Sequence, residues 1–359
     1  MKIAFLLPSA YGMRGDVRAM LNLAGGLAAR HEVEVVSIRR TRETPFFPVD
    51  RRVTLRWLVD TRPGVHHLLP RGQVRTEVAL WRMLRGLQAD VLVTTRPSLS
   101  VQAARYAPRD VVRIAREWSR PSVPGPVRRF YPRLDAVVAS TTGRRDEWAR
   151  LLDDDLSVHA IPDALPATPW PRSRMDNRIV SAGGRLVPGK SYDQLVRAFA
   201  IVADKRPDWR LRLYGGGPEE RRLRALVRDL DLHNHVYFMG TTPDLPGEFA
   251  KASIVAVPAR HEVLGMTVIE ALSCGVPIVG FDGSRGPAEF LRPGHDSVLV
   301  QEGESGDVEP LACALLTLVD DERRRMKLAA GALETASAHA ATAVAVRWEE
   351  LMYGLRSRP

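Results

Sequence analysis

The chain has 359 residues, of which 45% are hydrophobic and 26% charged, so it is long enough to form two cores of ordinary domain size. No stretch approaches the roughly 18 consecutive apolar residues that a membrane-spanning helix needs, which argues against an integral membrane protein. The only two cysteines, Cys274 and Cys313, lack metal-ligand spacing, which argues against a disulfide scaffold or a zinc site. The apolar run Ile3–Leu7 is too short for a secretory signal and is interrupted by Pro8. We therefore expect a cytoplasmic protein of two domains.

The formal net charge of +10 is concentrated in the first half of the chain. Residues 1–165 hold 27 basic and 17 acidic residues, whereas the remainder holds 25 of each. This asymmetry predicts an anionic partner, such as a phosphate polymer, a glycolipid or the inner face of the plasma membrane in peripheral contact. Alternatively, it reflects a GC-rich genome, because 47 of the 52 basic residues are arginine. A nucleic-acid partner is not expected, since no motif supports one.

In the first half, short apolar runs alternate with amphipathic helical stretches. The first run, Ile3–Leu7, is followed by the glycine-containing segment Gly12-Met13-Arg14-Gly15 and a helix through Val17–Arg30. Further strand-like runs are Val33–Ile38, Val91–Thr94, Val111–Ala115 and Ala136–Ser140. This alternation predicts a parallel sheet flanked by helices.

The proline-rich segment Pro162–Asn177 is interpreted as a linker, after which the alternation restarts. Strands at Arg178–Ala182 and Arg210–Tyr214 alternate with helices at Tyr192–Lys205 and Glu219–Leu230, and a helix is expected at Ala341–Leu355. We predict an α/β fold with two doubly wound Rossmann-like domains that face each other across a cleft. The N-terminal domain spans 1–165, the C-terminal domain spans 166–340, and the helix in 341–359 crosses back to the N-terminal domain. Ligands of such folds bind at the carboxyl ends of the strands.

The most informative motif is Pro258–Val279. A predicted strand leads into a helix that begins near Gly265 and is stopped by Gly275. The backbone N–H groups at the helix start, at Gly265, Met266 and Thr267, form an anion site. Two carboxylates bracket this site: Glu262 before the helix and Glu270 inside it. A nucleotide sugar, with hydroxyls at both ends and a diphosphate between them, suits that arrangement.

A second motif, GGRLVPGK, supplies cations. Arg185 follows a predicted strand and Lys190 lies at the start of the next helix, so both could clamp a diphosphate through charge-assisted hydrogen bonds. Lys190 by itself would be an ordinary solvated residue. The Gly215-Gly216-Gly217 run lacks the spacing of a dinucleotide-binding loop and is equally consistent with a plain tight turn.

These motifs together resemble the retaining glycosyltransferases of family 4, which have the two-domain GT-B fold. The similarity is strongest over residues 178–300, and the stretch FDGSRGPAEF at 281–290 is most similar to members of the poly(glycerol-phosphate) alpha-glucosyltransferase type. The resemblance implies transfer of a hexosyl group from a nucleotide diphosphate sugar, with uridine as the expected base, to a hydroxyl of a glycan, polymer or small-molecule acceptor. It also implies retention of anomeric configuration and no bound cofactor or metal.

The resemblance further implies roles for individual residues. Arg185 and Lys190 hold the diphosphate and Glu262 contacts the donor sugar. Gly12, Gly15 and the amides of Gly265, Met266 and Thr267 also bind the donor, and Glu270 holds the ribose. On the acceptor side we expect Glu117, Trp118, Arg128 and Arg129. Three positions depart from the family pattern: Trp118 replaces a common histidine, Arg14 replaces a common glycine, and Val263-Leu264 replaces Gly-Phe.

Other interpretations remain open from sequence. The pairs His66-His67, Asp229/Asp231 and His233/His235 mimic metal ligands, but each lacks a further ligand and is expected in a loop or at a helix end. The chain could also be a sugar-nucleotide epimerase of the same fold, a glycosyltransferase of secondary metabolism, or a polymer-binding relative that has lost activity.

Overall fold

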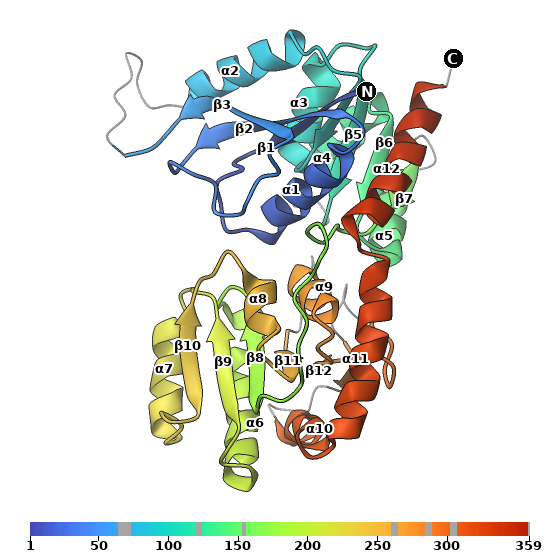
Figure 1. Cartoon of the computed structure of the whole chain (residues 1–359). Coiled ribbons are helices and arrows are strands. Elements are labelled where there is room, and N and C mark those ends of the chain that lie inside the picture. Colours follow the sequence, from blue (N-terminus) through green and yellow to red (C-terminus); the bar gives the residue numbers. More distant parts are fainter. Residues whose placement is uncertain are drawn as a thin grey trace. The chain divides into compact units, whose positions relative to one another are not determined.

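The computed structural model describes residues 1–63, 73–119, 124–152, 156–259, 265–283, 289–301 and 307–357. The chain forms two compact units (Figure 1). Unit 1 consists of Met1–Ala167 together with His339–Pro359, and unit 2 is Thr168–Ala338. Each unit is an α/β structure with its own core and is described by itself.

Unit 1 contains a seven-stranded parallel sheet in the order β3-β2-β1-β4-β5-β6-β7. Its strands are β1 (Lys2–Leu7), β2 (Glu32–Arg40), β3 (Val53–Asp60), β4 (Val91–Thr94), β5 (Val112–Glu117), β6 (Ala136–Ala139) and β7 (Val158–Ala160). The inner strands β4 and β6 are buried along their whole length. Continuous apolar strands of this kind are typical of a parallel sheet covered by helices on both faces.

The helices of unit 1 cover the two faces of this sheet. They are α1 (Gly15–Leu27), α2 (Gln73–Arg85), α3 (Pro97–Tyr106), α4 (Pro124–Phe130), α5 (Thr142–Leu152) and α12 (Ala341–Arg356), with a 3₁₀ turn η1 at Tyr131–Arg133. The chain runs from β1 to β2 in one direction along the sheet and from β3 onward to β7 in the other. Because such crossovers are right-handed, α1 lies on one face and α2 to α5 lie on the opposite face.

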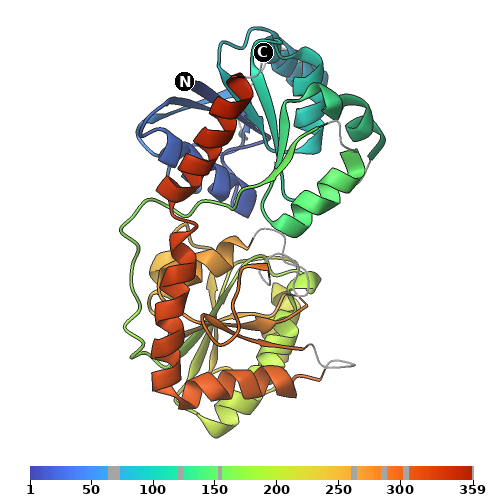
Figure 2. The same ribbon diagram turned by 90° about the vertical axis from the view of Figure 1, so that its right-hand side faces the viewer.

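The last helix, α12, belongs to unit 1 and packs beside α1 (Figure 2). A Cβ added at Gly26 of α1 would lie 2.8 Å from the carbonyl oxygen of Ala341, so only glycine permits this approach. The Glu349 carboxylate of α12 is 2.9 Å from His31 Nε2 and 2.6 Å from Arg30 Nη2. Close packing and these polar contacts hold the end of the chain on unit 1.

Unit 2 contains a six-stranded parallel sheet in the order β10-β9-β8-β11-β12-β13. Its strands are β8 (Ile179–Gly183), β9 (Arg210–Tyr214), β10 (Val236–Gly240), β11 (Ile254–Val257), β12 (Ile278–Phe281) and β13 (Ser297–Val300). Its helices are α6 (Tyr192–Lys205), α7 (Glu220–Asp229), α8 (Leu245–Phe249), α9 (Met266–Ser273), α10 (Glu309–Asp320) and α11 (Glu322–Ser337), with a 3₁₀ turn η3 at Pro188–Lys190.

The predicted fold class, α/β with two doubly wound parallel sheets, is confirmed. The segment Pro162–Asn177 is less loose than its composition indicates. Asp163 and Leu165 are buried in unit 1, where the Leu165 backbone N–H donates to the His339 carbonyl at 2.8 Å, and Met175 is buried in unit 2. Prolines remove periodicity from a segment without preventing individual side chains from packing, so the linker is partly incorporated into each core.

Candidate active site

In unit 2, the predicted donor residues gather at the point where the strand order reverses. The strands β9 and β10 lie on one side of β8, and β11 to β13 lie on the other. Loops leaving the carboxyl ends of β8 and β11 therefore diverge, and ligands of doubly wound sheets bind in the resulting crevice. The loop after β8 carries Arg185 and Lys190, and the chain after β11 leads to the start of α9. The topology thus brings the two sequence motifs to one edge of the sheet.

Lys190 lies over the carboxyl end of β8. It closes the turn η3, whose last backbone N–H donates to the Val187 carbonyl at 3.0 Å. A Cβ added at Gly184 would lie 4.0 Å from Lys190 Cε and 2.9 Å from the Tyr192 hydroxyl. Arg185 is exposed, while Leu186 beside it is buried and anchors the loop. The strand end therefore presents two cations on a backbone that is fixed by packing.

The triple glycine supports this loop directly. Gly215 has φ of +130°, and a Cβ there would lie 1.9 Å from the Gly184 carbonyl oxygen. A Cβ at Gly217 would lie 2.3 Å from the Leu186 carbonyl oxygen. Backbone hydrogen bonds join the two segments, from Gly184 to Tyr214 at 3.0 Å and from Leu186 to Gly216 at 3.1 Å. The run is thus a tight turn that lets one loop lie against the other.

The start of α9 has the geometry predicted from sequence. Gly265 precedes the helix with φ of +60°, a left-handed conformation that favours glycine. The Val268 and Ile269 N–H groups both donate to the Gly265 carbonyl, at 2.9 and 3.0 Å. In an α-helix, N–H groups before this point, here those of Met266 and Thr267, have no intrahelical acceptor and are suited to an anion.

Glu270 lies within α9 and is 2% exposed. The helix ends at Ser273, and Gly275, with φ of +69°, follows its cap as the stop that the sequence predicted. Glu262, with its neighbours Val263 and Leu264, lies outside the described residues, so its predicted contact with the donor sugar stays a prediction.

Unit 1 has an equivalent reversal between β1 and β4, and the predicted loop residues lie there. Gly12 follows β1 and Gly15 begins α1. Asp16 accepts hydrogen bonds from Arg14 Nε at 2.9 Å and Nη2 at 2.7 Å, and Arg96 Nη2 lies 3.4 Å from the same carboxylate. The departure at Arg14 thus has a structural partner, and Arg96 is a residue that sequence patterns did not single out.

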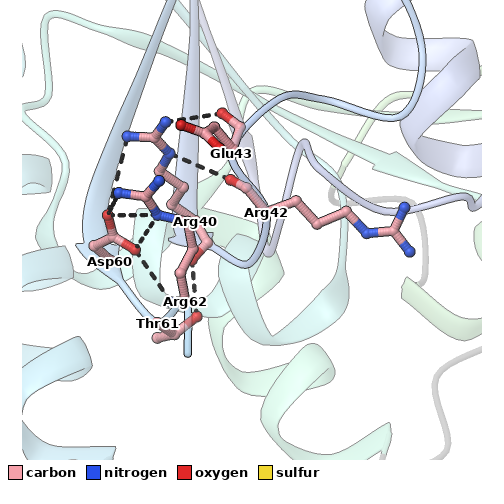
Figure 3. Close-up of polar contacts among 6 residues, drawn as sticks. All are labelled: Arg40, Arg42, Glu43, Asp60, Thr61 and Arg62. Atoms are coloured by element: carbon pink, nitrogen blue, oxygen red, sulfur yellow. Dashed lines mark hydrogen bonds and ion pairs between the residues drawn. The ribbon is translucent and has the colours of Figure 1, made fainter. Parts of the chain in front are cut away.

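A basic cluster at the carboxyl ends of β2 and β3 was also missed (Figure 3). Arg62 Nη2 donates to the Asp60 carboxylate at 2.9 Å, and hydrogen bonds from Arg62 lower the pKa of Asp60. Arg40 donates to the carbonyls of Arg42 and Glu43, at 3.3 and 2.8 Å, and its Nη1 lies 4.0 Å from Asp60. The Arg42 guanidinium points away from this group (Figure 3). The available clue was an Arg-Arg-Thr-Arg run directly after a predicted strand.

The Arg40 guanidinium also lies near two aromatic rings. Its Cζ lies 4.2 Å from the centroid of Trp57, which is 43% exposed, and 6.0 Å from that of Tyr11. Burial raises the pKa of Tyr11. This edge of the unit 1 sheet therefore combines arginines with an exposed aromatic side chain.

Glu117 and Trp118, predicted on the acceptor side, lie in the interior of unit 1. Trp118 Nε1 donates to Asp163 Oδ1 at 3.0 Å, and Arg116 Nη2 donates to the same atom at 2.6 Å. Arg116 is 1% exposed and its Nη1 donates to the carbonyls of Ala139 and Ile161, both at 2.8 Å. Trp118 is thus part of a buried hydrogen-bonded cluster, and its contact with an acceptor stays a prediction.

Glu117 is 2% exposed and accepts hydrogen bonds from the Tyr131 hydroxyl and from Ser100 Oγ. Burial raises the pKa of Glu117 to about 8, against the opposing effect of these hydrogen bonds and of Arg116. The carboxyl group is therefore protonated at neutral pH. Arg128 and Arg129 of α4 are exposed on the same unit.

Among the described residues, no group of three or more His, Cys, Asp and Glu side chains is placed to hold a metal ion. Asp229 and Asp231 are exposed at the end of α7, as predicted, and His233 is exposed beyond them. His66-His67 lies outside the described residues. No helix in the described ranges is long and apolar enough to cross a membrane.

Comparison with known proteins agrees with the fold. Residues 170–335 match the family Glycosyl transferases group 1. An exopolysaccharide phosphotransferase of Streptomyces coelicolor is 36% identical over 394 aligned residues, covering 100% of this chain and 41% of that relative. An uncharacterized glycosyltransferase of Haemophilus influenzae is 25% identical, covering 89% of this chain and 91% of the relative. The crystal structure of Anabaena HepE in complex with UDP and glucose aligns with a TM-score of 0.77 at 18% identity, covering 98% and 99% of the two chains.

The two doubly wound sheets and the similarity to solved structures show that the chain has the GT-B fold. The match to Glycosyl transferases group 1 is confined to residues 170–335, which is less than half of the chain. The chain spans less than half the length of the Streptomyces relative.

Proposed function

We propose that the chain transfers a hexosyl group from a nucleotide diphosphate sugar to an acceptor hydroxyl, with retention of configuration, as a family 4 glycosyltransferase. The donor occupies unit 2 and the acceptor occupies unit 1. The observation that carries this proposal is the convergence of Arg185, Lys190 and the start of α9 at the strand reversal between β8 and β11. A diphosphate needs cations and backbone N–H groups together, and that edge supplies both.

The chemistry follows from this arrangement. When the bond between the sugar and the diphosphate breaks, negative charge develops on the departing phosphate. The Arg185 guanidinium and the Lys190 ammonium stabilise that charge, and they do so most strongly in the transition state. The amides at Gly265, Met266 and Thr267 hold the same group, while Glu270 binds the ribose and Glu262 the donor sugar. The departing phosphate takes the acceptor proton on the same face, so no side-chain nucleophile and no metal are required.

The donor base proposed is uridine. The family resemblance also implies donor contacts for Gly12 and Gly15, which lie at the reversal between β1 and β4 of unit 1. A screen of nucleotide sugars by thermal stabilisation tests this, because a ligand that binds the native state raises its stability by RT ln(1 + [L]/Kd). Uridine diphosphate sugars are expected to stabilise the chain most. Equal stabilisation by every nucleotide sugar would contradict the preference for uridine. An unchanged melting temperature with all of them would contradict the proposed donor site.

The acceptor proposed is an anionic cell-wall polymer or glycolipid at the cytoplasmic face of the membrane. Support comes from Arg40 and Arg62 of the basic cluster at the carboxyl edge of the unit 1 sheet, and from the exposed Arg42 beside them. The affinity for a glycerol phosphate oligomer as acceptor should fall sharply with added salt. Arg42→Ala should reduce this affinity without changing the affinity for the donor. Arg323→Ala, an exposed change in α11, is the matched control. Salt-insensitive acceptor affinity would argue against an anionic acceptor.

A second candidate function comes from the Streptomyces relative, which is named as an exopolysaccharide phosphotransferase. A nucleotide diphosphate sugar has two cleavable linkages. Glycosyl transfer breaks the sugar–oxygen bond and releases a nucleoside diphosphate, whereas sugar-phosphate transfer breaks the diphosphate and releases a nucleoside monophosphate. Chromatography of the released nucleotide therefore distinguishes the two, and we expect the diphosphate.

The same assay separates the remaining alternatives. An epimerase would convert the donor to an isomer without any acceptor, and a binding protein that has lost activity would release no nucleotide above background. Product analysis with and without acceptor reports on both.

A further inference from the structure

Helix α2 of unit 1 carries apolar side chains on two separate faces. The face toward the sheet is buried and contributes to the core through Leu80, Met83 and Leu84. The second face exposes Val74, Val78 and Trp81, at 74%, 43% and 41%. A surface helix normally has a single apolar stripe, which faces the core. The second stripe is unexplained by packing within unit 1.

The spacing of this stripe is helical. Val74, Val78 and Trp81 are separated by four and three residues, so their side chains lie in one row along the helix. Arg85 continues the row, and its guanidinium lies 5.5 Å from the centroid of the Trp81 ring. Arg82 is exposed on the same helix. An aromatic ring bordered by arginines is characteristic of the water–lipid interface, where one part of the surface is apolar and the next is charged.

The neighbouring helices extend the positive charge. Helices α2, α3 and α4 cover the same face of the sheet, with α3 packed against each of the other two (Figure 1). Together with η1 they contain one acidic residue, Glu77, and seven arginines. These arginines are Arg75, Arg82, Arg85, Arg105, Arg128, Arg129 and Arg133.

Three of the arginines surround one aromatic side chain. The Cζ atoms of Arg105, Arg129 and Arg133 each lie 5.4 Å from the centroid of the Phe130 ring. All three arginines are exposed. Like charges held this close on a surface repel one another, and a dense negative counter-charge relieves that repulsion.

We propose that this face of unit 1, formed by α2, α3, α4 and η1, docks on an anionic lipid bilayer. The α2 stripe enters the interfacial region and the arginines of α3 and α4 contact lipid phosphates. Charge complementarity by itself would equally fit a dissolved polyanion. The three exposed apolar side chains favour the bilayer, because a dissolved polyanion gives them nothing apolar to bury against. This docking is independent of the proposed transfer reaction and needs neither donor nor acceptor.

The test is flotation of the full chain with phosphatidylcholine vesicles that do or do not contain phosphatidylglycerol. We expect binding only to the anionic vesicles, weakened by added salt. A variant with Val74→Ser, Val78→Ser and Trp81→Ser keeps the net charge and should bind these vesicles at least about tenfold more weakly. Arg129→Gln and Arg133→Gln should each weaken binding about fivefold.

Two controls make the outcome decisive. Met326→Ser, at a 53% exposed apolar position on α11 of unit 2, should leave binding unchanged. Circular dichroism melting checks that each variant is folded, which is expected because all the changed side chains are exposed. In parallel, each protein is titrated with long-chain polyphosphate as a dissolved polyanion.

Loss of vesicle binding in the triple serine variant, with unchanged polyphosphate binding, supports docking on the bilayer. Equal vesicle binding by the triple serine variant and the wild type would overturn the proposal in favour of a site for dissolved polyanions. Absence of binding to anionic vesicles would overturn it outright, and would leave the proposed glycosyl transfer untouched.

Discussion

The Glu117 carboxyl group accepts a hydrogen bond from the Tyr131 hydroxyl inside unit 1, at the end of strand β5. Both side chains are buried, Tyr131 completely, and its ring stacks on Trp148 with the centroids 5.4 Å apart. The pair is a polar contact surrounded by apolar side chains, and burial of this kind disfavours the charged form of an acid.

This burial predicts a pH dependence of stability. The pKa of Glu117 is about 8 in the folded chain against 4.5 for an ordinary glutamate. The folded state therefore binds the Glu117 proton more tightly than the unfolded state does. The resulting contribution to the free energy of unfolding is complete below pH 4.5 and is lost as the pH rises through 8. Glu117→Gln removes this dependence. Its melting temperature relative to wild type should increase between pH 5 and pH 8. The exposed change Glu350→Gln is the control. The same pH dependence of the melting temperature, relative to wild type, in both variants would contradict the prediction.

The buried ion pair between Arg116 and Asp163 predicts a large loss of stability. The side chains are 1% and 3% exposed and their closest N and O atoms are 2.6 Å apart. Asp163→Ala leaves the guanidinium buried without its counter-charge, which costs about 3–5 kcal/mol of unfolding free energy. Denaturant titration measures this. Asp146→Ala breaks an exposed pair with Arg145 and should cost at most about 1 kcal/mol. Similar losses in the two variants would mean that Arg116 is compensated by other groups.

The proposed diphosphate clamp predicts a catalytic defect. Lys190→Ala should lower turnover by about 10²–10³, the scale observed when one donor that stabilises transition-state charge is removed. Initial rates at saturating donor concentration provide the measurement. Lys205→Ala, at the far end of helix α6, which follows the turn that contains Lys190, should be nearly neutral. A Lys190→Ala enzyme with the wild-type rate would remove this residue from the proposed mechanism.

The contact between the two glycine-containing loops predicts a position-specific effect. Gly215→Ala places a methyl group against the Gly184 carbonyl oxygen in a backbone conformation with φ of +130°. It should cost about 1–3 kcal/mol from strain alone, and should displace the loop that carries Arg185 and Lys190. The adjacent Gly216→Ala meets only the Thr241 methyl, at 3.7 Å, and is the matched control. Equal melting temperatures for the two variants would contradict the predicted contact.

The sequence alone determined the parts of this protein that are local. The helix Tyr192–Lys205 and the strand Arg210–Tyr214 were predicted with their observed bounds, because hydrophobic period and glycine stops are read within one turn or one strand. The start of α9 directly after Gly265 and its end just before Gly275 followed from the same kind of local chemistry. The two-domain α/β class followed from the repeated alternation.

Only the tertiary structure decided which distant residues meet. Nothing near Trp118 in sequence indicated that its indole would pair with Asp163, or that Asp16 would bind both Arg14 and Arg96. The strand β3 and the helix α2 were not predicted, and with them the Arg40–Asp60–Arg62 cluster and the exposed row of α2 were missed. These features depend on strand order and crossover direction, which are set by long-range packing, and single-chain periodicity does not encode them.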